Sequence, residues 1–453
     1  MARLTSLEQG WSTIPIGTRC TAARVDAFDV RAGMSFSRNV YKCEPLDVGE
    51  VPNPISSELV RKEFLNFVRG EFGTGSQRGP CPAEKSCTSA GSIPFGVLES
   101  LSAQYESPVY DGYLDNLLRK TSGSAGHKVF AILSDEKLGN PANRKNVDQA
   151  EFIKTFNTAI EADSRLRFVF LGFPFKDQNR FRTAVTPNIP DAAEVALLIR
   201  LHALTLAIFQ VLPLGVDWVV LSDGIPYHDI FRIRLSDAVS YRQRLQDIRT
   251  RLNLTGSVHI LDLQQLADAH VNRAGEVIVE SYSREIEAVL RILDDEDVRR
   301  ALHVLKRGMK WNMQLNDVFA SVGWTSAWEI LNNEDSKELT GADLDVWRHI
   351  DALASDAAFR YAAFNIAVRV SRLLTTMLPS HMRATVHPKR GQVAIPRIGD
   401  VFPWNGVAVM EGWTSGATLR SIEVMPLYEI FNRVQSPEYI VLDNEVDPFV
   451  YLR

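Results

Sequence analysis

The sequence predicts an α/β protein with a mostly parallel, Rossmann-like sheet, helices on both faces, a helical insertion and a β-rich C-terminal part. Apolar runs of strand length, such as RFVFLGF and VDWVVLS, alternate with longer segments of helical periodicity. Each of these runs stops abruptly at a polar or Gly/Pro cluster, as buried parallel strands do where the chain leaves the sheet. Strands that alternate with helices imply a parallel sheet covered on both faces.

The elements follow in chain order. We expect strands at VFAILS, RFVFLGF, VDWVVLS and SVHILDL. The spacing of apolar residues predicts helices at 57–68, 146–162, 191–211 and 236–252. The third of these begins with Pro190 and Asp191, and a fixed φ and a carboxylate both suit a helix N-terminus.

Three further regions flank this α/β core, which spans about 93–275. Residues 1–92 form a predicted N-terminal extension. Residues 276–380 have helical patterns, and 381–412 shorten to strand-like pieces such as RATVHP, QVAIP and GVAVM. We therefore predict one catalytic region at 93–412, followed by a tail at 413–453 that packs on the core.

The composition is that of an ordinary soluble globular protein, with 45% hydrophobic and 23% charged residues. A net charge of −5 creates no field that favours nucleic acid or an anionic membrane, so we expect neither as a partner. The most apolar stretch, 192–221, contains charged residues and is expected to be a buried helix followed by a strand. The first residues lack the basic and apolar segments of a secretory signal. These features predict a cytoplasmic protein.

The cysteines are Cys20, Cys43, Cys81 and Cys87, and their spacing does not resemble a zinc ligand set. Reduced thiols are the expected state, and a redox role is the alternative.

Polar side chains follow the predicted strands where these end. Lys176 comes after RFVFLGF, and Ser222 and Asp223 close VDWVVLS. Such positions suit a ligand crevice, although a surface lysine and a simple Asp-Gly turn are the alternatives. Asp191 and Glu194 lie three residues apart on one helix face, where they can contact a substrate or only cap the helix.

A second polar group lies some two hundred residues later. Arg383 and His387 alternate on one side of a strand-like segment, so both can face one pocket. Arg383 is the expected clamp for a phosphate or carboxylate group, and His387 either transfers protons or caps a strand end. Trp404 either walls the pocket or packs in the core. His202, inside an apolar helix, is expected to be a hydrogen-bonded core residue.

Five short blocks, taken together, resemble the isocyanide (isonitrile) synthase family, also described as the pyoverdine/dityrosine biosynthesis family. They are FPFKDQN, PDAAE, VVLSDG with a following HD, RATVHP and PWNGV. Family members carry, in this order, Phe-Pro-x-Lys-x-x-Asn, Pro-Asp-x-(Ala)-Glu, Ser-Asp-Gly-Arg with a later Asp, Arg-(x)3-His-Pro and Pro-Trp-(His)-x-Val-Val. The resemblance covers roughly residues 100 to 412.

The resemblance implies that the α-amine of an amino acid condenses with the ketone carbon of ribulose 5-phosphate, which ends as the isonitrile carbon. No metal or organic cofactor is then required, and tailoring enzymes that use the product are possible downstream partners. The chemistry needs proton donors and acceptors with pKa values near neutrality. The expected catalytic residues are Lys176, Asp223, His387, Glu194 and Asp229. The expected substrate-binding residues are Arg383, Lys389, Arg390, Ser222, Trp404, Asn179 and Asp191.

Two positions depart from the family pattern. Ile225 stands where the family has an arginine after Ser-Asp-Gly, and Asn405 stands where a histidine is common. If that arginine holds a substrate anion, Arg232, Arg234 or another residue must replace it, or the substrate differs. The alternatives are therefore a related enzyme with different chemistry on an amino-acid-derived amine, and a non-catalytic binding protein on the same fold.

Overall fold

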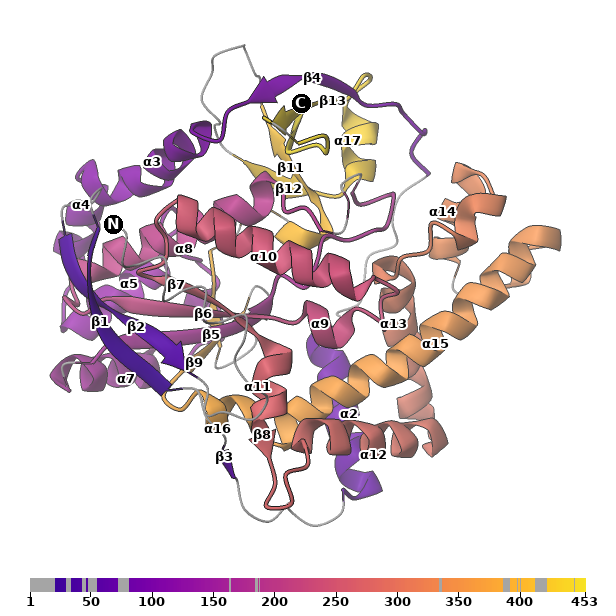
Figure 1. The fold of residues 1–453 in the computed structure, drawn as a ribbon, viewed down its shortest axis with the longest axis horizontal. Coiled ribbons are helices and arrows are strands. Elements are labelled where there is room, and N and C mark those ends of the chain that lie inside the picture. Colours follow the sequence, from indigo (N-terminus) through magenta and orange to yellow (C-terminus); the bar gives the residue numbers. More distant parts are fainter. Residues whose placement is uncertain are drawn as a thin grey trace.

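A parallel sheet lies at the centre of the protein in the computed structural model, with helices around it and a second sheet beside it (Figure 1). The structure describes residues 21–29, 34–42, 46–47, 55–71, 81–162, 164–183, 186, 188–333, 336–385, 392–396, 398–399, 401–411, 422–443 and 445–453.

The central sheet has the strand order β10-β9-β5-β6-β7, and all its strands are parallel. The strands are β5 (Leu166–Gly172), β6 (Val216–Ser222), β7 (Val258–Asp262), β9 (Met382–Thr385) and β10 (Val393–Ala394). From β5 the chain moves to β6 and then β7, whereas β9 and β10 lie on the other side of β5. The direction of winding therefore reverses between β5 and β9, and in open α/β sheets a ligand crevice lies at such a point.

Each face of the central sheet has its own apolar core, because side chains alternate along a strand. Phe168 and Phe170 of β5 belong to one core, and Val169 to the other. The first face packs against α3 (Val97–Tyr110), α5 (Ala125–Leu133), α7 (Gln149–Glu161), α8 (Ala192–Phe209) and α10 (Leu235–Arg251). The second face packs against α2 (Ser57–Glu71), α11 (Leu263–Ala269), α12 (Ile278–Ile292), α13 (Glu296–Asn312) and α15 (Gly341–Val370). The predicted α/β fold class is confirmed.

Helix α8 is apolar on all sides and lies inside the protein. Asp191 caps its start, since its Oδ1 accepts the Ala193 amide at 2.7 Å while Glu194 Oε2 accepts the Asp191 amide at 2.9 Å. The helix is long and apolar enough to cross a membrane, but 89% of it is buried in the structure. This burial identifies α8 as a core helix, as predicted.

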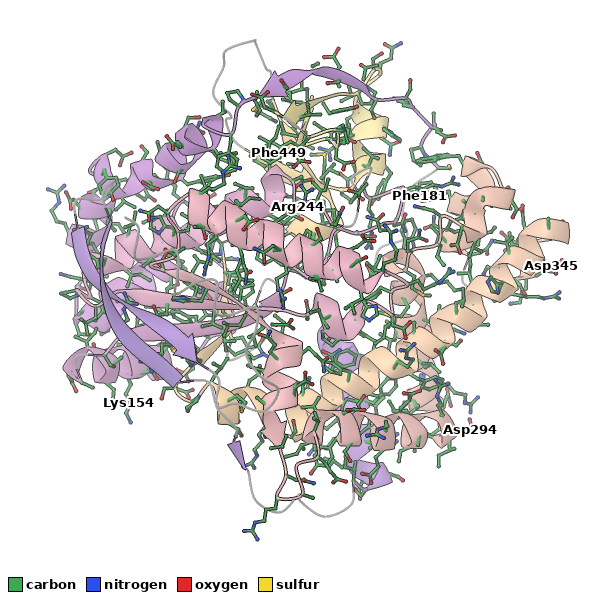
Figure 2. All side chains as sticks on the ribbon, viewed as in Figure 1. Lys154, Phe181, Arg244, Asp294, Asp345 and Phe449 are labelled. Atoms are coloured by element: carbon green, nitrogen blue, oxygen red, sulfur yellow. The ribbon has the colours of Figure 1, made fainter. Side chains whose placement is uncertain are left out.

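The helical part continues with α14 (Trp324–Asn332), the long α15, and α16 (Leu373–Met377). Figure 1 shows α15 crossing the helical half of the molecule as one rod. The side chains in Figure 2 fill the space between these helices, and Phe181 lies near α14. Its ring packs against Trp311, Trp324 and Trp328 with centroid distances of 6.1, 4.3 and 5.1 Å. These contacts fix the loop that follows β5 to the helical part.

A second sheet joins one strand that precedes the central sheet in the sequence to the C-terminal strands, with the order β12-β11-β14-β13-β4. Its strands are β4 (Thr88–Ile93), β11 (Val407–Met410), β12 (Glu423–Met425), β13 (Glu438–Leu442) and β14 (Val450–Leu452). It thus contains residues from either side of the expected boundaries at 92 and 412, and the division into three regions stays a prediction.

The other described elements lie outside the two five-stranded sheets. The strands are β1 (Thr21–Asp29) and β2 (Met34–Lys42), which form an antiparallel pair, and β3 (Leu46–Asp47) and β8 (His270–Val271), which form a parallel pair. The helices are α4 (Tyr113–Lys120), α6 (Asn143–Asn146), α9 (Gly224–Tyr227) and α17 (Leu427–Arg433), with 3-10 turns η2 (Val318–Ser321), η3 (Ser336–Glu338) and η4 (Pro403–Asn405). Cys81 and Cys87 are free thiols, and Cys20 and Cys43 lie outside the described residues.

One predicted strand is wrong, because VFAILS lies within helix α5. Ser124 precedes the helix and its amide donates to His127 Nδ1 at 3.1 Å, which closes a capping box. Val129, Phe130 and Leu133 then face the core at helical spacing. A short apolar run does not distinguish a strand from a buried helix, and here the cap decides. The strands expected at RFVFLGF, VDWVVLS and SVHILDL are confirmed as β5, β6 and β7.

Candidate active site

A cavity of about 640 Å³ opens at the carboxyl ends of β5, β6 and β9, where the winding of the sheet reverses. Of the residues predicted to act together, Asp223, Arg383 and Trp404 all line it. Asp223 follows β6, Arg383 lies in β9, and Trp404 lies in η4, which precedes β11. The fold therefore joins two segments that are far apart in the sequence.

The loops after β5 and β6 line this cavity and are in close contact with each other. Directly after β5, Phe173 has a φ of 56°, a left-handed conformation that turns the chain out of the sheet. The buried Ser222 hydroxyl donates to the Phe173 carbonyl at 3.0 Å. A Cβ on Gly224 would lie 1.9 Å from the Pro174 carbonyl oxygen, so only glycine fits here. Ser222 thus joins the two loops and is absent from the cavity lining.

The cavity lining contains charged side chains. Its charged lining residues are Asp177, Asp223, Arg369, Arg372 and Arg383. Asp177 is nearly fully buried and receives Arg182 Nη1 at 2.8 Å, while Arg369 Nη1 pairs with Glu63 at 2.9 Å. Guanidinium groups beside carboxylates provide both anion binding and proton transfer sites.

The cavity lining also contains many aromatic side chains. The aromatic lining residues are Phe67, Phe175, Tyr227, Phe231, Tyr361, Phe402 and Trp404. The Tyr361 ring lies 5.0 Å from Tyr227, 5.6 Å from Phe231 and 5.7 Å from Phe67, measured between centroids. Phe402 stacks on Trp404 at 5.1 Å with an interplanar angle of 11°. A flat apolar group would find contact area against these rings.

Lys176 lies behind the cavity wall and not in its lining. Its Nζ contacts Asp191 Oδ2 at 2.9 Å, Glu194 Oε1 at 3.0 Å and the Pro403 carbonyl at 2.8 Å. The Tyr241 hydroxyl donates to Glu194 Oε1 at 2.9 Å. We call Lys176, Asp191, Glu194 and Tyr241 the Lys176 cluster, and all four side chains are buried.

The groups of the Lys176 cluster shift one another's pKa values. Burial opposes the charge on Lys176, but Asp191 and Glu194 outweigh it and raise the pKa of the ammonium above its usual value. Burial raises the pKa of Glu194 well above its usual range, and the neighbouring Asp191 carboxylate adds to this effect against the attraction of Lys176. Burial also raises the pKa of Tyr241, as does Glu194.

The remaining predicted site residues lie elsewhere. Asn179 donates to the Trp311 carbonyl at 3.0 Å and accepts the Phe181 amide at 3.0 Å, which holds the loop after β5 in place. Asp229 is exposed, and its hydrogen bond with Arg360 lowers the pKa of its carboxyl. Neither Asn179 nor Asp229 lines the cavity.

Three predicted residues, His387, Lys389 and Arg390, lie outside the described residues. The catalytic and binding roles assigned from the sequence therefore stay predictions. His202 is buried and its Nδ1 lies 2.8 Å from Ser257 Oγ, which is the core arrangement expected for it.

The cations proposed to replace the family arginine at position 225 are engaged elsewhere. Arg232 pairs with Asp317 at 2.7 Å and Arg234 with Asp237 at 2.9 Å, and neither arginine lines the cavity.

The helical part brings residues to the cavity that sequence reasoning missed. Arg369 lies in the last turn of α15, Arg372 follows it, and Asn312 ends α13. No described residue forms an ion pair with Arg372. The Arg-rich composition of this segment was visible, but its meeting with the strand edge depends on how α15 packs.

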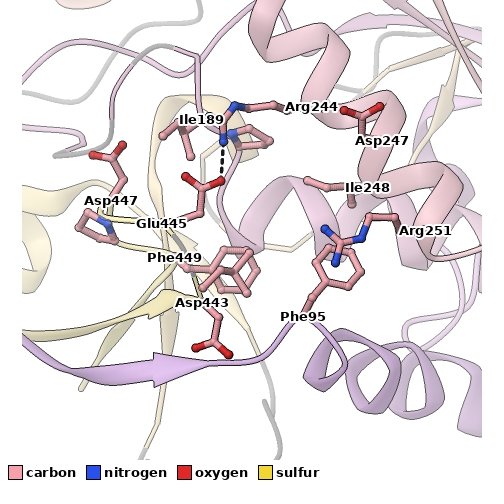
Figure 3. A pocket seen from close by; sticks show the side chains of 13 residues that line it. Phe95, Ile189, Arg244, Asp247, Ile248, Arg251, Asp443, Glu445, Asp447 and Phe449 are labelled. Atoms are coloured by element: carbon pink, nitrogen blue, oxygen red, sulfur yellow. Dashed lines mark hydrogen bonds and ion pairs between the residues drawn. The ribbon is translucent and has the colours of Figure 1, made fainter.

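A second cavity of about 630 Å³ lies between α10 and the C-terminal strands (Figure 3). Arg244 from α10 pairs with Glu445 at 2.7 Å across it, and the Arg251 guanidinium lies 3.3 Å from the centroid of the Phe95 ring. None of the predicted site residues lines this cavity. The cavity at the strand ends is therefore the candidate active site.

The fold and the cavity define a class of protein. A pocket with convergent charged groups and aromatic walls, at the switch point of a parallel sheet, is typical of an enzyme that acts on a small molecule. Within that class, residues 156–425 match the model of the pyoverdine/dityrosine biosynthesis protein family. The chain belongs to this family, and the resemblance seen in the sequence is confirmed.

Two similar proteins of Aspergillus fumigatus are named as isocyanide synthases. The chain is 32% identical to the isocyanide synthase–NRPS hybrid crmA over 106 residues, which are 23% of this chain and 7% of that protein. It is 26% identical to isocyanide synthase A over 142 residues, which are 31% of this chain and 23% of that protein. The aligned parts thus span less than a quarter of either relative.

A solved structure is also similar, namely that of the PvcA protein from Pseudomonas aeruginosa. It has 20% sequence identity and a TM-score of 0.46, and the match covers 66% of this chain and 89% of PvcA.

Proposed function

We propose that the protein is an isonitrile synthase that condenses the α-amine of an amino acid with ribulose 5-phosphate. The observation that carries the proposal is the meeting of Asp223, Arg383 and Trp404 in one cavity at the switch point of the sheet. These three residues come from separate blocks of the family pattern. Family membership supports the reaction class, and the lining supports two anionic substrates that meet beside a carboxylate.

The first chemical step suits the charged residues of the cavity lining. The neutral amine adds to the ketone carbon, and water leaves to give an imine, so both amine protons must move from nitrogen to the departing oxygen. Asp223 is the proposed group for this transfer, and His387 is the second candidate. Arg383 and Arg372 are the proposed partners of the sugar phosphate and the amino-acid carboxylate.

The aromatic residues of the cavity lining give the proposal a substrate preference. The rings of Tyr227, Phe231 and Tyr361 pack on one another in this lining. We expect amino acids with large apolar or aromatic side chains to be preferred over glycine and alanine.

The test is incubation of the full chain with ribulose 5-phosphate and each common amino acid. The proposal expects an isonitrile from at least one of them, detected by its mass and its infrared band. If protein shown to be folded by circular dichroism yields no isonitrile with any of them, the proposed function is wrong.

The position of Ile225 favours one alternative, a related enzyme with different chemistry on an amino-acid-derived amine. Ile225 is half-buried, does not line the cavity, and replaces an arginine of the family pattern. Ribulose 5-phosphate separates the two functions, because a ligand that binds only the folded state raises the melting temperature. The first function expects such a rise, and the alternative expects none. A non-catalytic protein would form no product from any amine.

We also propose that the enzyme works in the cytoplasm, where its small-molecule substrates occur. Enzymes that tailor the isonitrile are the proposed downstream partners.

A further inference from the structure

Lys176 has no hydrogen left to give to a substrate. Its ammonium group has three donors, and Asp191, Glu194 and the Pro403 carbonyl accept at 2.9, 3.0 and 2.8 Å. The side chain has no exposed surface and does not line the cavity. A lysine that forms a covalent bond also needs a lowered pKa, whereas the two carboxylates raise it here.

The rest of the Lys176 cluster ties distant elements together. Glu194 Oε2 accepts the Asp191 amide at 2.9 Å, and Asp191 Oδ2 accepts the Ala408 amide of β11 at 3.3 Å. The Tyr241 hydroxyl reaches Glu194 from α10. The cluster therefore joins the loop after β5, the start of α8, α10 and β11.

Trp404 is the cavity residue that this arrangement holds. The Pro403 carbonyl, which binds Lys176, belongs to the peptide group that joins Pro403 to Trp404. The Trp404 carbonyl in turn accepts the amide of Asp177, the residue after Lys176, at 2.8 Å. Two consecutive residues thus fix the backbone on both sides of Trp404.

The Trp404 ring is closely packed. A Cβ on Gly172, the last residue of β5, would lie 2.8 Å from the ring. Phe173 packs against the same ring at 5.2 Å, and Phe402 stacks on it. A shift of the Trp404 backbone would therefore change the shape of the cavity wall.

We infer that Lys176, Asp191, Glu194 and Tyr241 are positioning residues, which set Trp404 against the cavity and so fix the room for the substrate side chain. This inference deepens the proposed function and rests on it for its kinetic test. Its consequence is selectivity: loosening the cluster changes which amino acids fit, and not the proton transfer itself.

The kinetic test compares Lys176→Met with Tyr241→Phe in the full chain. Lys176→Met leaves two buried carboxylates without a counter-charge, so Tyr241→Phe, which removes one hydrogen bond, provides a milder change. The readout is the ratio of kcat/KM for the best amino acid to that for the next smaller one. We expect this ratio to change roughly tenfold in Lys176→Met and less, in the same direction, in Tyr241→Phe. Lys176→Arg should have a ratio between those of Lys176→Met and the unmodified protein.

A double-mutant cycle shows whether Lys176 acts through Trp404. In a Trp404→Ala background, Lys176→Met should leave the ratio unchanged. The matched control is Arg165→Met, which removes a buried ion pair with Asp217 near the amino end of β5. It should lower the melting temperature without changing the ratio.

Two results would overturn the inference. One is an equal loss of turnover for all amino acids that persists in the Trp404→Ala background. The other is a substrate-derived mass on Lys176 after borohydride reduction during turnover. If the unmodified protein forms no isonitrile at all, the proposed function fails by itself. The crystal structure of Tyr241→Phe then decides the inference, which expects a displaced Trp404 ring and is wrong if the ring has not moved.

Discussion

Asp223 follows β6 directly and lines the cavity, and it is the proposed proton-transfer group. Asp223→Asn keeps the shape of the side chain but removes its ability to accept a proton. We expect kcat/KM to fall roughly a hundredfold or more. The melting temperature should change little, since the Asp223 side chain makes no capping hydrogen bond to α9.

The control for this change is Asp294→Asn, a highly exposed carboxylate in the helical part (Figure 2). It should leave kcat/KM unchanged. Equal activity of Asp223→Asn and the unmodified protein would exclude Asp223 as the proton-transfer group.

Arg372 offers a test of anion binding. It lines the cavity just after α15 and is the proposed partner of a substrate anion. Arg372→Gln should raise the KM for ribulose 5-phosphate roughly tenfold or more, with a smaller effect on kcat. Arg348→Gln, an exposed arginine within α15, is the control and should leave the KM unchanged. A rise of similar size in both variants would mean that the effect is a general change of surface charge.

At the scale of elements, the close contact of the loops after β5 and β6 shapes the site. Gly224→Ala would place a Cβ 1.9 Å from the Pro174 carbonyl, so the two loops must move apart. We expect a loss of roughly 2 kcal/mol or more in the free energy of unfolding, measured by denaturant titration. Gly96→Ala, whose Cβ would meet no atom within 4 Å, should be nearly neutral. If both substitutions were neutral, the loops would not be in close contact.

The elements also show how far the sequence leads. RFVFLGF and VDWVVLS predict β5 and β6 because a buried parallel strand is apolar on both faces and its run ends with the sheet. VFAILS has the same character, yet the cap at Ser124 makes it a helix. A reading of apolar runs alone cannot separate these cases, whereas a search for caps before each run would have done so.

The site residues also fall into those that the sequence predicts and those that it does not. Asp223, Arg383 and Trp404 were found because they end strand-like runs or match a family block. Arg369 and Arg372 were missed because their place depends on where α15 ends against the sheet, and this is a property of tertiary packing. The burial of Lys176 was missed for the same reason, since its partners come from α8 and η4.

At the scale of the whole molecule, stability should depend on pH through His381, which precedes β9. Burial lowers its pKa from 6.5 to about 4 in the folded state. Between pH 6.5 and 4 the unfolded chain binds a proton that the folded protein does not, so stability is full above about pH 6.5 and is lost as the pH falls toward 4. We expect a loss of roughly 1–2 kcal/mol, allowing for the partial exposure of the side chain.

Urea unfolding at pH 7 and pH 4.5 measures this effect. His381→Gln should flatten the pH dependence, while His349→Gln, an exposed position on α15, should not. An unchanged slope in His381→Gln would show that other groups cause the acid sensitivity.

The two halves of the cavity come from segments that are far apart in the sequence. β5 and β6 supply one half, and β9 and η4 supply the other after the helical part has been completed. The central claim is that this cavity joins an amino acid to the ketone carbon of ribulose 5-phosphate.

The most direct measurement follows that carbon. The full chain is incubated with ribulose 5-phosphate labelled with carbon-13 at its ketone position and with the preferred amino acid, and the product is examined by carbon-13 NMR. The account predicts that the label appears in the isonitrile carbon, and that Asp223→Asn greatly lowers the rate at which this signal grows. An isonitrile without the label, or a labelled product of another kind, would contradict it.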